Sequence, residues 1–182
     1  MIYLILDVYY QDDGDGTHAH VVAIRFTGVK RHTILNHYWL DVPDVAPYQS
    51  GQFYQREMPC LLALLATISE PFDVIIIDGY VYLDGQQKAG LGKHLYDHLP
   101  TPKPIIGIAK NRFIDISEHF VVYRGISKHP LYVTSIGIDD PTTLVKQLQG
   151  KHRLPDIVSL VDKLSRSTNR SLHKNRPIQS GF

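Results

Sequence analysis

The chain has few of the features that would place it outside an ordinary cytoplasmic setting. Its 182 residues include one cysteine, Cys60, so no disulfide can form within the chain. No apolar run reaches the roughly 18 residues that a membrane-spanning helix needs. The first residues lack the basic segment and cleavage site of a secretory signal peptide. The net charge of +1 does not by itself indicate a nucleic-acid partner. We therefore expect a cytoplasmic protein without membrane contact.

Strand-forming sequence dominates the first half of the chain. Three segments share β-branched and aromatic content and are separated by short polar turns: residues 2–10, 20–29 and 32–41. They predict an antiparallel meander. Residues 74–77 are an unbroken β-branched run, which is typical of a strand buried on both faces. Residues 104–109 predict a second such strand, parallel to it through a helix at 90–98. Residues 120–124 and 131–134 predict a late hairpin.

The remaining periodic segments predict helices. Apolar residues recur at helical spacing from Met58 to Ile68, which predicts a helix over 57–69 with Pro59 in its first turn. Two more helices are expected over 141–149 and from 156 onward. Together the elements predict an α/β fold with a mixed sheet of about five strands, three antiparallel and then parallel, plus the hairpin. Residues 1–166 would form one catalytic domain, and 167–182 a basic, partly disordered tail.

Acidic residues occur at positions where these strands and helices would meet. Asp7 lies in the first strand and Asp78 directly follows residues 74–77, while Lys110 follows the strand at 104–109. If the first and fourth strands are neighbours, Asp7 and Asp78 face one pocket. Clustered carboxylates repel each other, and a hard cation such as Mg²⁺ relieves this. Clustered carboxylates that share a divalent cation, with a lysine nearby, are the general arrangement in ribonuclease H-like nucleases. The alternative is that Asp78 only caps the next turn.

Five short motifs also occur in an order that resembles the endonuclease V family. The run from Pro47 to Glu57 resembles its Pro-Tyr-x-x-Gly-x-x-x-x-Arg-Glu motif, and Asp78-Gly79 follows at the family's spacing. The other matches are Gly90-Leu91-Gly92 with His94-Leu95, Ile106-Gly107-Ile108-Ala109-Lys110, and Arg153-Leu154-Pro155-Asp156 with Asp162 beyond it. The resemblance runs from Asp7 to about Leu164.

The resemblance implies a Mg²⁺-dependent endonuclease, with Mn²⁺ as an alternative ion, that acts on inosine-containing DNA or RNA. It would cut one phosphodiester beyond the inosine's own 3′ linkage and leave 5′-phosphate and 3′-hydroxyl ends. The implied metal ligands are Asp7, Glu57, Asp78 and Asp162, and with Lys110 on the scissile phosphate they form the catalytic set. The implied substrate-binding residues are Tyr48, which would act as a wedge, Gly51, Gly79, Tyr80 and Asp84.

The sequence also departs from the family where the substrate would be read. The family's Tyr-Ile-Pro wedge is Tyr48-Gln49-Ser50 here, which should insert less well into a duplex. Val81 replaces an expected glycine and would crowd a base pocket. Asp84 stands at an expected histidine, where it would either add a metal ligand or remove a proton donor. Two alternatives therefore stay open: a relative that binds nucleic acid but cuts poorly, and a nuclease of other specificity. The partner would be single-stranded or locally unpaired DNA or RNA.

Overall fold

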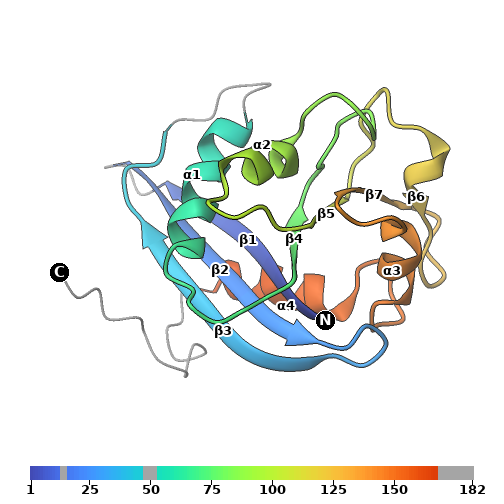
Figure 1. Cartoon of the computed structure of the whole chain (residues 1–182), viewed down its shortest axis with the longest axis horizontal. Helices are drawn as coiled ribbons and strands as arrows, with labels where there is room; N and C mark the ends of the chain where they lie inside the picture. Colours follow the sequence, from blue (N-terminus) through green and yellow to red (C-terminus); the bar gives the residue numbers. More distant parts are fainter. Residues whose placement is uncertain (13–15, 47–52, 168–182) are drawn as a thin grey trace.

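The computed structural model describes residues 1–12, 16–46 and 53–167 and is built on one seven-stranded sheet (Figure 1). The strands are β1 (Ile2–Asp12), β2 (Thr17–Thr27), β3 (Thr33–Val42), β4 (Val74–Asp78), β5 (Ile105–Ala109), β6 (Val121–Val122) and β7 (Leu131–Ile136). The helices are α1 (Phe53–Leu65), α2 (Leu91–His98), α3 (Pro141–Gln147) and α4 (Asp156–Ser165). Within these ranges no helix is long and apolar enough to cross a membrane.

The strand order is β3-β2-β1-β4-β5-β7-β6, and it confirms the predicted mixed sheet. The first three strands pair antiparallel, and β1, β4 and β5 pair parallel. The late hairpin joins this same sheet, because β7 pairs antiparallel with β5. The sheet thus extends beyond the five strands expected of it.

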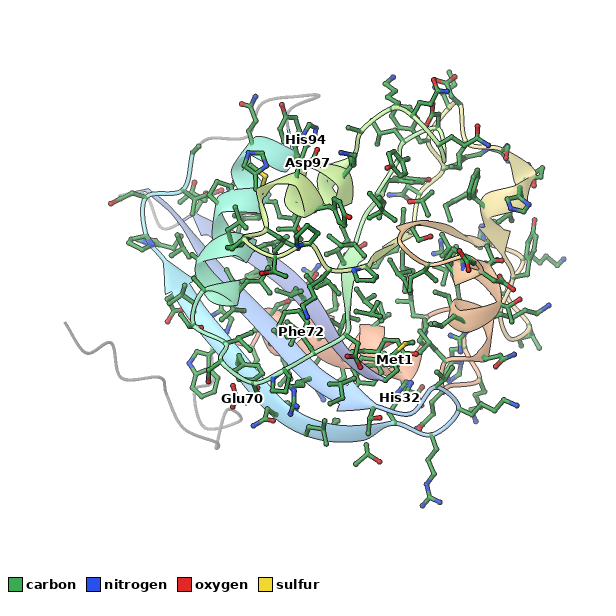
Figure 2. The ribbon with its side chains drawn as sticks, viewed as in Figure 1. Met1, His32, Glu70, Phe72, His94 and Asp97 are labelled. Atoms are coloured by element: carbon green, nitrogen blue, oxygen red, sulfur yellow. The ribbon has the colours of Figure 1, made fainter. Side chains whose placement is uncertain are left out.

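Alternate residues of the central strands pack into two separate layers. Ile75 and Ile77 of β4 pack with α1 and α2, whereas Val74 and Ile76 pack with α3 and α4. In Figure 1, α1 and α2 lie in front of the sheet and α4 lies behind it. The side chains in Figure 2 fill the space between the ribbons on both faces. The β-branched run of β4 is therefore buried on both faces, as its sequence predicts.

Helix α1 begins earlier than its sequence pattern indicates, and this corrects the predicted place of Glu57. Because α1 starts at Phe53, Pro59 lies inside the helix rather than in its first turn. A proline there leaves the carbonyl of Gln55 without its helical partner. Both Pro59 and Gln55 are exposed, so water can satisfy that carbonyl. Glu57 consequently lies within the helix and is not explained by a favourable position at the helix end.

Candidate active site

The five residues predicted to be catalytic line one pocket of about 330 Å³. Strand β1 supplies Asp7, and the ends of β4 and β5 supply Asp78 and Lys110. Leu6 of β1 pairs with Ile77 of β4, which places the two following aspartates side by side in the parallel ladder. Helices α1 and α4 supply Glu57 and Asp162 from opposite sides of the sheet. The topology therefore gathers charges that are far apart in the sequence.

Lys110 is the positive centre of this pocket. Its Nζ lies 2.6 Å from Oδ2 of Asp78 and 3.7 Å from Oδ1 of Asp162. Burial lowers the pKa of Lys110, but the hydrogen bond and charge of Asp78, with the charge of Asp162, raise it by more. The net pKa lies above the ordinary value. Lys110 therefore carries a full positive charge between two carboxylates.

Asp7 is the buried aspartate of the group, with 8% of its surface exposed. The hydroxyl of Ser165 in α4 donates a hydrogen bond to Oδ2 of Asp7. Burial raises the pKa of Asp7 to about 6; the bond from Ser165 opposes this rise, and the charges of Asp78 and Asp162 add to it. Asp7 is thus an acid whose ionised form is costly unless positive charge is brought near.

Glu57 is the deepest carboxyl group of the pocket and is only 5% exposed. Its Oε2 has no hydrogen-bond partner among the described residues. Burial raises the pKa of Glu57 well above its ordinary value, and the charges of Asp7 and Asp78 add to the effect. A buried oxygen that lacks a protein partner calls for an explanation, and a bound ion is one of the usual ones.

These carboxylates fit a divalent cation by their chemistry. Hard cations such as Mg²⁺ take oxygen ligands, and the unpartnered Oε2 of Glu57 provides one. In the part of the chain that the structure describes, no three His, Cys, Asp or Glu side chains are already arranged as a ligand set. Lys110 bonds to Asp78 and lies near Asp162 instead. The donor set is present, and holding an ion would require Lys110 to give up these contacts.

Gly79 and Tyr80, two of the residues predicted to bind substrate, form one wall of the pocket. Gly79 has a φ of +126°, a conformation that favours glycine, and its backbone crosses close to β5. A Cβ on Gly107 would lie 2.4 Å from the Gly79 carbonyl oxygen, so this crossing requires glycine in β5. The Tyr80 hydroxyl donates to the carbonyl of Asn111 at 2.8 Å and accepts from the Phe113 N–H at 3.0 Å.

Val81, which was expected to crowd a base pocket, is not among the residues that line this pocket. Its side chain is fully buried and packs in the layer that contains α1 and α2. Its N–H donates to Oγ1 of Thr134 at 2.8 Å. The valine that stands in place of the expected glycine therefore packs into the hydrophobic core.

Asp84 is not among the residues that line the pocket. Its Oδ1 accepts hydrogen bonds from three successive N–H groups, those of Gln86, Gln87 and Lys88, at 2.9, 2.9 and 3.0 Å. These bonds lower the pKa of Asp84. The carboxylate holds its own turn together. The two other predicted substrate-binding residues, Tyr48 and Gly51, lie outside the described residues.

Sequence reasoning missed two residues that belong to the site, Ser165 at the end of α4 and Arg166 directly after it. Ser165 bonds to Asp7, and Nε of Arg166 lies 3.2 Å from Oδ2 of Asp162. The Arg166 guanidinium also lies over the ring of Tyr9, 5.2 Å from its centroid. Both residues follow Asp162 by a helical turn, so they share its face. That spacing is the signal that would have found them.

Comparisons with known proteins agree on one family. A family model described as endonuclease V matches residues 4–134. An endonuclease V from Ignicoccus hospitalis is 28% identical over 185 residues, an alignment that spans 92% of this chain and 82% of that protein. The matched range of the family model contains Asp7, Glu57, Asp78 and Lys110, whereas Asp162 lies beyond it.

Two solved structures share the fold. The crystal structure of an endonuclease V from Bacillus subtilis has a TM-score of 0.74 at 20% identity and covers 96% of this chain and 83% of that one. An endonuclease V from Ciona intestinalis has a TM-score of 0.72 at 16% identity, covering 94% and 87%. The latter was solved with a 24mer DNA that contains an inosine followed by a ribo-adenosine. At these identities the likeness establishes a common fold.

Proposed function

Because this chain belongs to the endonuclease V family, we propose that it is a metal-dependent endonuclease acting near inosine or deoxyinosine in DNA or RNA. It would hydrolyse one phosphodiester bond beyond the inosine's own 3′ linkage and leave 5′-phosphate and 3′-hydroxyl ends. The observation that carries the proposal is the single pocket in which four carboxylates meet Lys110. Hydrolysis of a phosphodiester needs concentrated positive charge at the phosphate, and such a pocket can hold it.

Four residues would hold the ion: Asp7, Glu57, Asp78 and Asp162. Support comes from the buried, unpartnered Oε2 of Glu57 and from the raised pKa of Asp7, both signs of negative charge that lacks compensation. Mg²⁺ is the proposed ion, and Mn²⁺ is the alternative. When bound, a divalent cation would supply positive charge and Lewis acidity at the phosphate.

Three side chains of the protein would contact the phosphates or orient the metal ligands. The Lys110 Nζ would leave Asp78 and donate to a non-bridging phosphate oxygen, where its positive charge offsets charge that develops during hydrolysis. The Ser165 hydroxyl would keep Oδ2 of Asp7 in one orientation. Arg166, which is 59% exposed and lies at the pocket, would contact a neighbouring phosphate.

The substrate-reading side would be formed by Gly79 and Tyr80, which line the pocket, together with Tyr48 and Gly51, which lie outside the described residues. An enzyme that reads one base takes it out of the stack, so an open wall beside the catalytic groups is needed. A Cβ at Gly79 would meet nothing within 4 Å, which leaves room beside that residue. Asp84 would contribute indirectly, by holding the turn that follows this wall.

The proposal is tested with end-labelled oligonucleotides that carry one deoxyinosine or one inosine, single- and double-stranded, with Mg²⁺, with Mn²⁺ and with EDTA. We expect one cut displaced to the 3′ side of the modified nucleotide, only with the ions present. Ligation and phosphatase sensitivity of the products identify their ends. Cleavage that persists in EDTA, or no cleavage of any of these substrates with either ion, would overturn the proposal.

A second candidate is a relative that binds nucleic acid but has lost turnover. The observation that favours it is Asp84, whose carboxylate is engaged by its own turn, so it does not supply a proton donor at the pocket. Binding of the same oligonucleotides measured by fluorescence anisotropy, without any cleavage over hours, would support this candidate. Turnover would exclude it.

A further inference from the structure

Arg153 connects the active-site lysine to a second segment of the sheet. Its Nη2 donates to the main-chain carbonyl of Lys110 and, at 2.8 Å, to the carbonyl of Pro130. Its Nε donates to the same Pro130 carbonyl at 3.3 Å. Lys110 directly follows β5 and Pro130 directly precedes β7, and these strands pair antiparallel. One guanidinium thus fixes the main chain of Lys110 where the strand ladder no longer holds it.

Arg153 is itself held in place by Arg124. The Arg124 side chain is buried, with 5% of its surface exposed. All of its hydrogen bonds go to main-chain carbonyls of the segment between α3 and α4 or at its ends: those of Lys146, Leu148, Gly150, His152 and Arg153. The bond to the Arg153 carbonyl is 3.3 Å long. Arg124 therefore shapes the segment that delivers Arg153 to Lys110.

The same segment leads into the helix that carries Asp162. The Asp156 N–H, at the start of α4, donates to the Gln149 carbonyl at 2.9 Å, which fixes the entry to the helix. Asp162 then lies two helical turns further on, with Oδ1 3.7 Å from Nζ of Lys110. Arg153 thus joins the two parts of the site that must keep their relative positions, the end of β5 and the α4 helix.

We propose that Arg153 is a positioning residue that acts through Lys110, with Arg124 as its support. The inference rests on the proposed nuclease function. Neither arginine lines the pocket, and the hydrogen bonds described above join both to main-chain carbonyls. A lysine side chain has four rotatable bonds, so the place of its ammonium depends on a fixed Cα. Misplacing a catalytic group by about 1 Å can lower a rate by about 100-fold.

The test is a double-mutant cycle on the full chain, with Arg153→Gln, Lys110→Met and the double variant. Single-turnover cleavage rates are measured with excess enzyme, and the Kd for the oligonucleotide is measured separately. We expect Arg153→Gln to lower the rate about 10- to 100-fold with little change in Kd. In the Lys110→Met background the same change should cost nothing further, because the group that Arg153 positions is already gone.

Arg25→Gln is the matched control. Its Nε donates to the Pro71 carbonyl at 2.9 Å, so the variant loses the same kind of bond near the N-terminal end of β4, away from Asp78. This control should cut at the wild-type rate. If Arg153→Gln fails to fold by circular dichroism, Arg153→Lys, which keeps one donor, is carried through the same cycle.

The possible results distinguish failure of the inference from failure of the proposed function. Equal fold losses from Arg153→Gln in the wild-type and Lys110→Met backgrounds would show that Arg153 does not act through Lys110, and would overturn the inference. If the wild-type protein cuts the substrate and Arg153→Gln cuts it equally fast, the inference about Arg153 is wrong, while the proposed nuclease function stands. If the wild-type protein cuts no substrate, the proposed function fails and the inference fails with it.

Discussion

Replacing Asp7 by asparagine should stabilise the metal-free protein at pH 8 while it removes cleavage. Asparagine keeps an oxygen that can accept the hydrogen bond from Ser165, so the change removes mainly the negative charge. Asp7 is 8% exposed and lies near two other carboxylates, and burial raises its pKa to about 6. In the folded protein the ionised form of Asp7 is therefore penalised.

The sign and size follow from proton linkage. Because the folded-state pKa is raised, the folded protein binds this proton more tightly than the unfolded chain does. That stabilisation is complete below the ordinary value of 3.8 and is lost as the pH rises through about 6. About 2 pH units at about 1.4 kcal/mol each give a penalty of about 3 kcal/mol above pH 6. Asp7→Asn should remove this penalty, except for any part of it that relaxation of the wild-type fold already relieves.

The assay is urea unfolding in EDTA at several pH values. The free energy of unfolding of Asp7→Asn should exceed that of the wild type by up to about 3 kcal/mol at pH 8, by about half as much at pH 5 and by almost nothing near pH 4. Asp97→Asn is the control; Asp97 lies on α2 (Figure 2), is 47% exposed and pairs with Lys93. It should give no such gain at any pH. A variant less stable than the wild type at pH 8, or a difference independent of pH, would refute the reasoning.

Three further predictions concern single residues. Lys110→Met should slow cleavage strongly, to a residual rate that single-turnover measurements still resolve, and should tighten Mn²⁺ binding in isothermal titration calorimetry, because the ammonium 2.6 Å from Asp78 no longer competes; weaker binding would count against the site. Gly107→Ala should lower the free energy of unfolding by about 1–3 kcal/mol, since its Cβ would lie 2.4 Å from the Gly79 carbonyl oxygen, and an unchanged melting temperature would contradict this. Asp84→Ala should make the turn at 84–88 sensitive to limited proteolysis without changing Mn²⁺ affinity; lost affinity would instead place Asp84 at the metal.

The sheet could be predicted because its signals are local and strong. The β-branched run of residues 74–77 predicts a strand buried on both faces, and the parallel pairing of β1 with β4 then brings Asp7 beside Asp78. The hairpin was found as well, but nothing in residues 120–134 says which strand it joins. That depends on the free edge of β5, which only the assembled sheet reveals.

The features that escaped prediction have separate physical causes. The pattern of α1 suggested a start at Glu57, because Pro59 is favoured in a first turn; an exposed interior proline costs less than a buried one and was tolerated instead. The bonds from Arg153 to main-chain carbonyls leave no trace in residue types, since every residue carries a carbonyl. The resemblance predicts that Asp84 binds substrate, and that role stays a prediction; the bonds that its carboxylate accepts from N–H groups within four residues along the chain were not anticipated.

The most direct test of the central claim is Mg²⁺-dependent cleavage of a single-stranded oligonucleotide with one deoxyinosine, by the wild type and by Asp78→Asn. Asp78 contacts Lys110 and lines the pocket, so replacing it should affect both the proposed metal site and the proposed catalytic lysine. We expect one cut to the 3′ side of the deoxyinosine by the wild type, and none by the variant, which should remain folded. Equal cleavage by the two proteins would show that the pocket is not where the chemistry occurs.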